Sequence, residues 1–494
     1  SATVTGPFKV LGVLVKFSDK TSSVSAQYFD SLVFDSMGNT VKNFFKEISY
    51  SQLDLITVNL PSSMGWRTAP QTYAYYVNGS YGTGSYPHNS QKLVEDMVDA
   101  IDSLVDFSQY DNNHDGYMDV MLVIHSGTGA EKSGNVNDMW SHKWGINPRL
   151  KDGVYISSYT VQPEYWNNPG DMTIGVYSHE LCHGFGLPDL YDTDNSSRGV
   201  GRWCLMSYGS WNGTNGNSPA HPSAWCLSKM GFRTPINVTG TMSNQLIPNI
   251  EQGGPIYRLW TAGAANSEYY LVENRQKLLS DAGLPGSGLL IWHCDDSKGG
   301  ASNTQEWWPG QPAANHYEVA LVQADGLYEM EHNTDVGDAA DPFPGTGNVV
   351  TFSDATSPSA NSYAGGITNV QVTNISPSSG FMTATFVVSI AADVNDNDHN
   401  LPTTMTLGQN YPNPFNPSTT ISYELPTSGN VNLDVYNLLG EKVRTLYDGS
   451  AQAGVKSVIW DGTNDHGESV SSGVYFYRLT TKQGTVVKKM VMLK

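Results

Sequence analysis

YSHELCHGFGLPDLYD, residues 177–192, is the most informative stretch of this 494-residue sequence. His179 and His183 stand four residues apart, so on a helix their imidazoles lie on one face, one turn apart. Neutral imidazole is a preferred zinc ligand. Glu180 lies about 100° around the helix from His179, so it flanks the metal without occupying a ligand position. The spacing predicts a metal site with a carboxylate base beside it.

The residues that follow predict a third ligand. Gly184 and Gly186 permit positive φ angles and Pro188 discourages further helix, so the chain should reverse near Gly186. That reversal would bring Asp189 back toward the two imidazoles, which completes a three-ligand zinc layout with an open fourth position for water. The alternative is a buried helix end with a glycine turn, in which backbone groups satisfy the histidines and Asp189 caps the next segment.

Length and pattern predict a multidomain chain, because about 150 residues is a common domain size. Strand-like and helix-like stretches mix in the first part, whereas short apolar or alternating segments dominate the remainder. We expect an α/β catalytic domain at residues 1–236, a mostly β domain packed on it at 237–390, an Asp/Asn-rich linker at 391–400, and an immunoglobulin-like β-sandwich at 401–494. Within the first domain, residues 8–17 and 118–124 are expected as buried strands and residues 41–48 and 91–104 as helices.

Composition excludes several partners. The net charge of −20 argues against nucleic acid and anionic membranes and leaves carboxylates free for divalent cations. No apolar run approaches the roughly 20 residues needed to span a bilayer. The four cysteines Cys182, Cys204, Cys226 and Cys294 do not form a zinc-binding pattern, so free buried thiols and disulfides both remain open.

The zinc stretch resembles the metzincin endopeptidases and, more closely, the immune inhibitor A (M6) family of secreted peptidases, whose zinc motif ends in Asp. Further family-like blocks include VKNFFKEISYSQLDL at 41–55, DNNHDGYMDVMLVIHSGTGAE at 111–131, EYYLVENRQ at 268–276 and LPGSGLLIWHCDD at 284–296. The resemblance covers about residues 8–390. It implies a zincin-like fold and a zinc endopeptidase in which Glu180 accepts a proton from metal-activated water.

The same resemblance implies two roles in CLMSYGSW, residues 204–211. Met206 would form an apolar floor beneath the zinc. Tyr208 stands where several metzincins place a tyrosine that hydrogen-bonds the tetrahedral oxyanion, although the immune inhibitor A pattern often lacks it. Core packing is an equal alternative for Tyr208.

Calcium is expected at a second kind of site. DNNHDGYMD matches the first nine positions of a calcium loop, with ligands from Asp111, Asn113, Asp115, Tyr117 (through its carbonyl) and Asp119. The twelfth position is Leu122, so the usual bidentate Glu is missing, and an Asx-rich turn is the alternative. GDAADPFPG, residues 337–345, offers Asp338 and Asp341, for which the family resemblance suggests another cation site.

The C-terminal part resembles the sorting domain of type IX secretion cargo over residues 401–494, in stretches such as LGQNYPNPFNPSTTISYELP. This resemblance implies export across an outer membrane, with surface attachment or release. It also leads us to expect that a signal peptide before Ser1 has been removed. The alternative is an immunoglobulin-like module that binds polymer or stabilises its neighbour.

Two functions compete. The leading one is a secreted, calcium-stabilised zinc endopeptidase that acts on proteins and meets the type IX machinery through its last domain. The other is a catalytically silent zincin-like adhesin. The presence of Glu180 favours the peptidase over the adhesin, because a structural zinc site needs no base.

Overall fold

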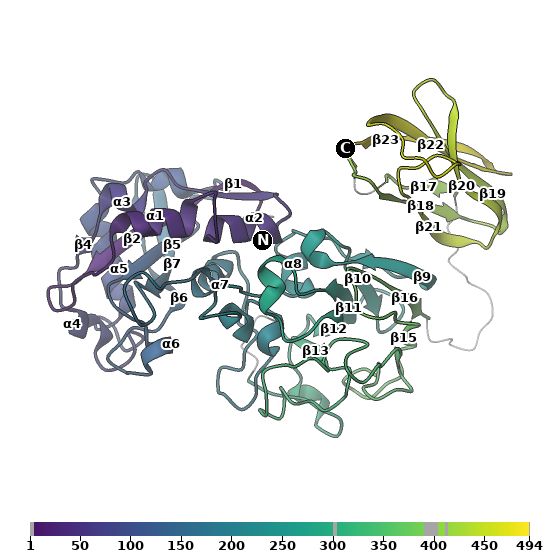
Figure 1. Ribbon diagram of the computed structural model, residues 1–494. Helices are drawn as coiled ribbons and strands as arrows, with labels where there is room; N and C mark the ends of the chain where they lie inside the picture. The colour runs from purple at the N-terminus through teal and green to yellow at the C-terminus, as the bar shows by residue number, and fades with distance from the viewer. Residues whose placement is uncertain (1–3, 300–303, 390–403, 411–412, 494) are drawn as a thin grey trace. The chain divides into compact units, whose positions relative to one another are not determined.

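The protein consists of two compact units, Ser1–Ala391 and Ala392–Lys494, seen in a computed structural model (Figure 1). The structure describes residues 4–299, 304–389, 404–410 and 413–493. The segment 391–400, predicted as a linker, lies outside the described residues. The boundary predicted at 236/237 falls inside the first unit, where β8 starts at Ile236, and it stays a prediction.

The N-terminal part of the first unit is built on a five-stranded sheet ordered β4-β2-β5-β7-β6. Four strands are parallel, and β6 runs antiparallel to β7 at the edge. The strands are β2 (Leu11–Lys16), β4 (Arg67–Thr68), β5 (Met121–His125), β6 (His142–Lys151) and β7 (Val154–Pro163). Residues 8–17 were expected as one strand but form two: β1 (Gly6–Lys9) pairs with β3 (Leu53–Ile56), and the chain passes at Val10 into β2.

Helices cover both faces of this sheet because its side chains alternate between two cores. Leu11, Val13 and Val15 of β2 face one core, whereas Val10 and Leu14 face the other. The first core also contains side chains of α4 (Tyr73–Val77) and α5 (Ser90–Ile101), and α3 (Pro61–Met64) contributes Met64. The second contains side chains of α1 (Ala26–Phe34), α2 (Val41–Ile48), α7 (Ile174–Gly184) and α8 (Ala224–Lys229). The short α6 (Ala130–Ser133) follows β5. The mixture of parallel strands and helices makes this region α/β.

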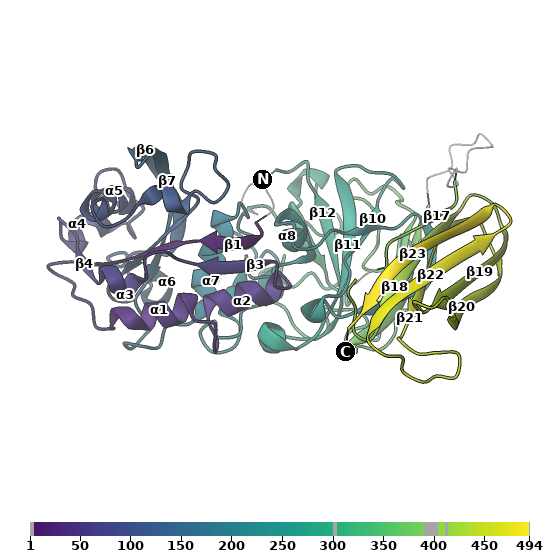
Figure 2. The ribbon, with the colours of Figure 1, turned by 90° about the horizontal axis from the view of Figure 1, so that it is seen from above.

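The rest of the first unit is mostly β. One sheet has the order β13-β12-β11-β10-β8 and a second has the order β14-β15-β16-β9. Alternate residues of β11 face opposite sides: Leu271 joins the core around α7, and Val272 joins the core between the two sheets. The strands are β8 (Ile236–Asn237), β9 (Gly240–Pro248), β10 (Tyr257–Trp260), β11 (Glu268–Arg275), β12 (Gly288–Asp295), β13 (Val319–Val322), β14 (Phe352–Ser353), β15 (Val370–Thr373) and β16 (Phe381–Val388). Helix α7 therefore lies between the α/β part and the β part, as both views show (Figures 1 and 2).

The second unit is a sandwich of two antiparallel sheets ordered β17-β18-β21 and β20-β19-β22-β23. Side chains of both sheets share one core that includes Trp460, Tyr423 and Tyr477. The strands are β17 (Thr406–Leu407), β18 (Thr419–Leu425), β19 (Gly429–Tyr436), β20 (Lys442–Ala451), β21 (Gly454–Trp460), β22 (Gly473–Thr481) and β23 (Gly484–Met492). In the described part of the chain, no helix is long and apolar enough to cross a membrane.

Candidate active site

Helix α7 carries His179, Glu180 and His183 through the middle of the first unit. Every residue from Ile174 to Cys182 is buried, as is typical of a helix packed between two layers. Glycine permits the close packing: a Cβ on Gly175 would clash with the carbonyl oxygen of Ser210. The helix is thus fixed against the segment that follows Met206.

The end of α7 turns the chain back. Gly186 has φ of +91°, in the left-handed region that glycine adopts without strain. Its N–H donates to the His183 carbonyl at 3.0 Å, and the Leu187 N–H donates to the Cys182 carbonyl at 3.2 Å. This hydrogen-bonded turn returns Asp189 toward the helix.

His179, His183 and Asp189 meet at one point. Oδ1 of Asp189 lies 3.1 Å from Nε2 of His179 and 3.1 Å from Nε2 of His183. The two imidazole rings stand nearly perpendicular, with centroids 4.8 Å apart. Three ligand atoms thus lie within 4.8 Å of one another, which is close enough to share one ion.

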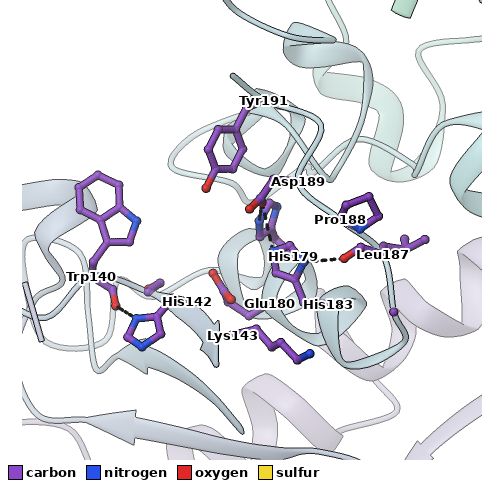
Figure 3. Close-up of a pocket in the computed structure, with 12 residues that line it drawn as sticks. Trp140, His142, Lys143, His179, Glu180, His183, Leu187, Pro188, Asp189 and Tyr191 are labelled. Atoms are coloured by element: carbon purple, nitrogen blue, oxygen red, sulfur yellow. Dashed lines mark hydrogen bonds and ion pairs between the residues drawn. The ribbon is translucent and has the colours of Figure 1, made fainter. Parts of the chain in front are cut away.

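Backbone carbonyls fix both imidazoles. Nδ1 of His179 lies 2.9 Å from the Leu205 carbonyl. Nδ1 of His183 lies 2.7 Å from the Leu187 carbonyl, as Figure 3 shows. A carbonyl only accepts hydrogen bonds, so each Nδ1 carries the proton and each Nε2 is left for a metal.

The electrostatics of the site favour a cation between the three side chains. Burial lowers the pKa of His179, but the hydrogen bond and charge of Asp189 outweigh it and raise that pKa to about 9. Burial likewise raises the pKa of Asp189, yet the two histidines hold it well below its usual range. Asp189 is therefore negatively charged and stabilises a positive charge between itself and the imidazoles, where a metal ion would bind.

Glu180 borders this point. Burial raises its pKa to about 7, against the opposing positive charges of His179 and His183. Its Oε2 is buried and has no hydrogen-bond partner among the residues that the structure describes. Two imidazole nitrogens, a carboxylate oxygen and an unpartnered carboxylate beside them fit a catalytic zinc ion and a water molecule.

Met206 and two tyrosines complete the surroundings. Met206 is fully buried, and its carbonyl accepts the N–H of Leu190 at 2.7 Å, which ties the segment beneath the site to the Asp189 turn. Tyr208 lies at the start of a 3₁₀ helix, Tyr208–Trp211, and its hydroxyl accepts from Arg198 Nη1 at 3.1 Å. Tyr191 lies beside Asp189, with its ring 6.2 Å from that of His179.

Two adjoining cavities form the cleft. The first, of 420 Å³, is lined by the three candidate ligands, Glu180 and residues of the edge strand β6 such as His142 and Lys143 (Figure 3). The second, of 540 Å³, shares His179, Glu180, Tyr191, Trp140 and Ser141 with the first and continues to Tyr208 and Trp211.

The loop predicted to bind calcium is held by its own side chains. The Asp111 carboxylate accepts the N–H groups of Asp115 and Gly116, at 3.1 and 3.0 Å, and Oδ2 of Asp119 accepts the N–H of Asn112 at 2.7 Å. Asn113 donates to Asp115, and Tyr117 pairs with Tyr155. Among the described residues, the loop does not bring three of its carboxylates within 4.8 Å of one another.

The Asp338 and Asp341 side chains have different surroundings. Asp338 converges with Asp325 and Glu329, two carboxylates that the sequence did not single out. Asp341 is buried and accepts hydrogen bonds from Trp203 Nε1 at 2.9 Å and from the Asp338 N–H at 2.8 Å.

The cysteines are four buried free thiols; Sγ of Cys204 and Sγ of Cys226 lie 4.0 Å apart. Two polar residues in family-like blocks, Glu131 and His142, are also engaged locally. Glu131 accepts from Ser141, His142 contacts Ser90 and the Trp140 carbonyl, and burial lowers the pKa of His142 to about 4.

Sequence reasoning did not identify Tyr191, Trp140 or Trp211 as cleft residues. Tyr191 lies two residues after Asp189, so its spacing offered a signal. Trp140 and Trp211 reach the cleft from separate segments, and only the tertiary fold brings them together.

Comparisons with known proteins find two family matches. Residues 23–232 match the family described as immune inhibitor A peptidase M6, catalytic domain, and residues 415–485 match the family described as FlgD Ig-like domain. Immune inhibitor A of Bacillus thuringiensis subsp. alesti is 32% identical over 180 residues, which cover 30% of this chain and 26% of that protein. Pre-pro-metalloprotease PrtV of Vibrio cholerae serotype O1 is 30% identical over 195 residues, which cover 33% of this chain and 20% of that protein. The chain thus matches about a quarter or less of the length of these relatives.

Similarities to solved structures are weak. Dimeric latent PorU from Porphyromonas gingivalis gives a TM-score of 0.16 at 19% identity, over 23% of this chain and 11% of that one. FlgD from P. aeruginosa gives 0.13 at 28% identity, over 15% and 58%. The family matches and the two relatives support a metallopeptidase of the immune inhibitor A (M6) type, with an α/β catalytic region, a mostly β C-terminal region and an Ig-like domain.

Proposed function

We propose that this protein is a secreted zinc-dependent endopeptidase that hydrolyses peptide bonds of extracellular proteins. The observation that carries the proposal is the convergence of His179, His183 and Asp189 on one point with Glu180 beside it. Three protein ligands leave a fourth position for water or substrate, which is the layout of a catalytic rather than a structural zinc site.

The chemistry follows from the positions of the side chains. A zinc ion held there would polarise the scissile carbonyl and lower the pKa of water. Glu180 would take the proton of the attacking water and pass it to the leaving amine, a role for which its buried carboxyl group beside the ligands is placed. The Leu205 and Leu187 carbonyls keep the imidazoles in position. In this proposal Tyr208 hydrogen-bonds the developing oxyanion, and Met206 provides the apolar floor.

The wider organisation is proposed as follows. Residues 1–236 form a metzincin-type catalytic domain, residues 237–390 pack on it, and residues 401–494 act as a type IX sorting domain that directs export across an outer membrane. The Ig-like match at residues 415–485 supports the class of the last domain. Surface attachment or release would then place the enzyme outside the cell.

Structural calcium belongs to the same proposal. The closed loop at 111–119 and the convergence of Asp338 with Asp325 and Glu329 support two candidate positions. The second position brings three carboxylates together, and the loop offers the side chains of Asp111, Asp115 and Asp119; carboxylate oxygen is the ligand type that calcium prefers.

The test compares wild type with Glu180→Ala and Glu180→Gln. We expect each protein to bind one zinc ion, and only wild type to hydrolyse casein or gelatin. Glu441→Ala, an exposed glutamate in the second unit, is the matched control and should cleave like wild type. If wild type carries one zinc ion and cleaves nothing, the peptidase proposal fails and a silent zincin-like adhesin takes its place.

A further inference from the structure

Two buried thiols lie in contact next to the segment that holds His179. Sγ of Cys204 is 4.0 Å from Sγ of Cys226, and both side chains are fully buried. Cys204 directly precedes Leu205, whose carbonyl lies 2.9 Å from Nδ1 of His179, and Cys226 belongs to α8. Neither thiol takes part in the proposed peptidase chemistry, so the contact calls for another explanation.

The other two thiols have different surroundings. Sγ of Cys294 lies 3.9 Å from the Trp292 carbonyl in β12, and Cys182 lies on α7 between the two candidate histidine ligands. A metal site built from thiols is excluded within the part of the chain that the structure describes, because no group of three convergent ligands there contains a cysteine. The contact between Cys204 and Cys226 therefore points to chemistry between two sulfur atoms.

The backbone already joins the two segments that carry these thiols. The Leu205 N–H donates to the His221 carbonyl at 3.4 Å, and the Ala220 N–H donates to the Gly209 carbonyl at 2.9 Å. The distance between the two sulfur atoms exceeds the length of a disulfide bond by about 2 Å. Rotation about the two Cα–Cβ bonds can close this gap, so the backbone needs little movement.

The two thiols differ in reactivity. Sγ of Cys204 accepts the N–H groups of Ser223 at 3.2 Å and Met206 at 3.4 Å. Burial raises the pKa of Cys204, but the Cys226 thiol and these two N–H groups outweigh burial and hold that pKa below its usual range. Burial holds the pKa of Cys226 well above its usual range. Because the thiolate is the form that attacks a disulfide, Cys204 is the nucleophile of the pair.

We propose that Cys204 and Cys226 form a modification site, at which an external disulfide oxidises the two thiols to one intramolecular disulfide bond. The Cys204 thiolate attacks one sulfur of the external disulfide, forms a mixed disulfide and releases one thiolate. Cys226 then loses its proton and attacks the Cys204 sulfur, which releases the second thiolate. Two electrons pass from the cysteines to the external disulfide, which leaves as two thiols. Because both sulfur atoms are buried in the folded protein, the exchange takes place while the chain folds.

The bond would restrain the segment that positions the candidate zinc ligands. It closes a loop between residues 204 and 226, and the Leu205 carbonyl within that loop holds His179. The Met206 carbonyl, also within the loop, accepts the N–H of Leu190 at 2.7 Å. A cross-link of this kind stabilises the folded state by restricting the unfolded chain. The proposed export would supply an oxidising environment, but the reaction requires neither zinc nor cleavage.

Counting thiols in the full wild-type chain tests the proposal. The reduced, urea-unfolded protein is refolded with reduced and oxidised glutathione, quenched with acid, alkylated under denaturing conditions and analysed by peptide mass spectrometry. We expect alkylation of Cys182 and Cys294 alone, and a peptide pair linked through Cys204 and Cys226. Protein refolded with reduced glutathione alone should be alkylated at all four cysteines. Alkylation of all four after oxidising refolding, or a disulfide with any other partner, would overturn the proposal.

Thermal unfolding of two variants separates the bond from general damage to the core. Oxidised wild type should have a Tm about 4 °C above that of reduced wild type. Cys226→Ala should have the same Tm under both conditions, whereas Cys294→Ala, the matched buried control, should keep the difference. A difference that Cys226→Ala retains, or that Cys294→Ala loses, contradicts the assignment to this pair. The thiol count of wild type needs no variant, so it decides even where a variant fails to fold.

The thiol count is also independent of the proposed peptidase function. Wild type that contains the bond but cleaves no casein would refute the peptidase and leave the disulfide assignment standing. Wild type that cleaves casein and retains four free thiols after oxidising refolding would do the reverse.

Discussion

Oδ1 of Asp189 lies 3.1 Å from Nε2 of His183, although the end of α7 and a reversal of the chain separate the two residues. The same oxygen lies 3.1 Å from Nε2 of His179, so one carboxylate oxygen faces both imidazoles. In place of a neutral third imidazole, this side chain brings a negative charge. That charge should strengthen the binding of a metal ion. It should also make the ion a weaker Lewis acid, so that the ion lowers the pKa of a bound water molecule less.

Asp189→His tests the consequence of this charge. We expect zinc to bind about 10-fold more weakly, because the ligand set loses one unit of opposite charge. The alkaline limb of the pH–rate profile should move to lower pH. Competition with a chromogenic chelator and rates across pH measure the two effects. The exposed Asp194→His, five residues further on, is the control. Unchanged affinity together with an unchanged alkaline limb would contradict the role of Asp189.

Substitution of Tyr191 should lower zinc affinity, whereas substitution of Tyr208 should lower kcat. Burial and the charges of Asp189 and Glu180 raise the pKa of Tyr191, so its hydroxyl stays protonated beside these carboxylates. Tyr191→Phe removes this polar group from the surroundings of Asp189, so zinc affinity should fall about 10-fold. Tyr208→Phe should leave zinc affinity intact and lower kcat by about 100- to 1,000-fold, as expected for a lost oxyanion donor. Chelator competition and steady-state kinetics on both variants decide. If Tyr208→Phe has the kcat of wild type, Tyr208 is a packing residue.

Local sequence signals predicted much of this site because they act within one turn of chain. The spacing of His179 and His183 and the glycines after them determine where the helix ends and where Asp189 returns. Gly186 has the positive φ that this reversal requires. The helix predicted at 41–48 also matches α2 in both bounds, because its apolar residues recur at helical spacing.

The remainder depends on tertiary contacts that the sequence does not display. The β6–β7 hairpin was not anticipated, because residues 142–151 are mostly polar or exposed at the edge of the sheet. The stretch 8–17 carries one apolar run, yet it serves two sheets, since β1 pairs with β3 and β2 pairs with β5. Trp140 and Trp211 likewise come from separate segments and line one cavity only in the folded protein.

Stability should fall toward alkaline pH because of Glu331. This buried carboxyl contacts Gln323 Nε2 at 2.6 Å, and burial raises its pKa from about 4.5 to about 8. The folded state therefore holds a proton that the unfolded state releases, so the stabilisation is full below about pH 4.5 and is lost as pH rises through about 8. The change is on the order of a few kcal/mol.

Urea unfolding of the first unit, followed by tryptophan fluorescence between pH 5 and 9, measures this effect. Glu331→Gln stays neutral throughout, so its unfolding free energy should depend less on pH than that of wild type. Glu441→Gln, exposed in the second unit, should retain the wild-type slope. A Glu331→Gln protein that loses stability as steeply as wild type would rule out this carboxyl as the cause.

Calcium should stabilise the first unit through the loop at 111–119. Burial and the charges of Asp111 and Asp115 raise the pKa of Asp119, so the closed loop holds carboxylates that repel one another. A bound cation removes this repulsion, and an ion that binds only the folded state stabilises it by mass action. Titration of calcium at fixed zinc should raise the Tm of wild type, and Asp119→Asn should abolish most of the increase. Asp338→Asn, in the cluster with Asp325 and Glu329, is the matched comparison. If only Asp338→Asn removes the increase, the stabilising ion binds at that cluster and the loop at 111–119 is an Asx-rich turn.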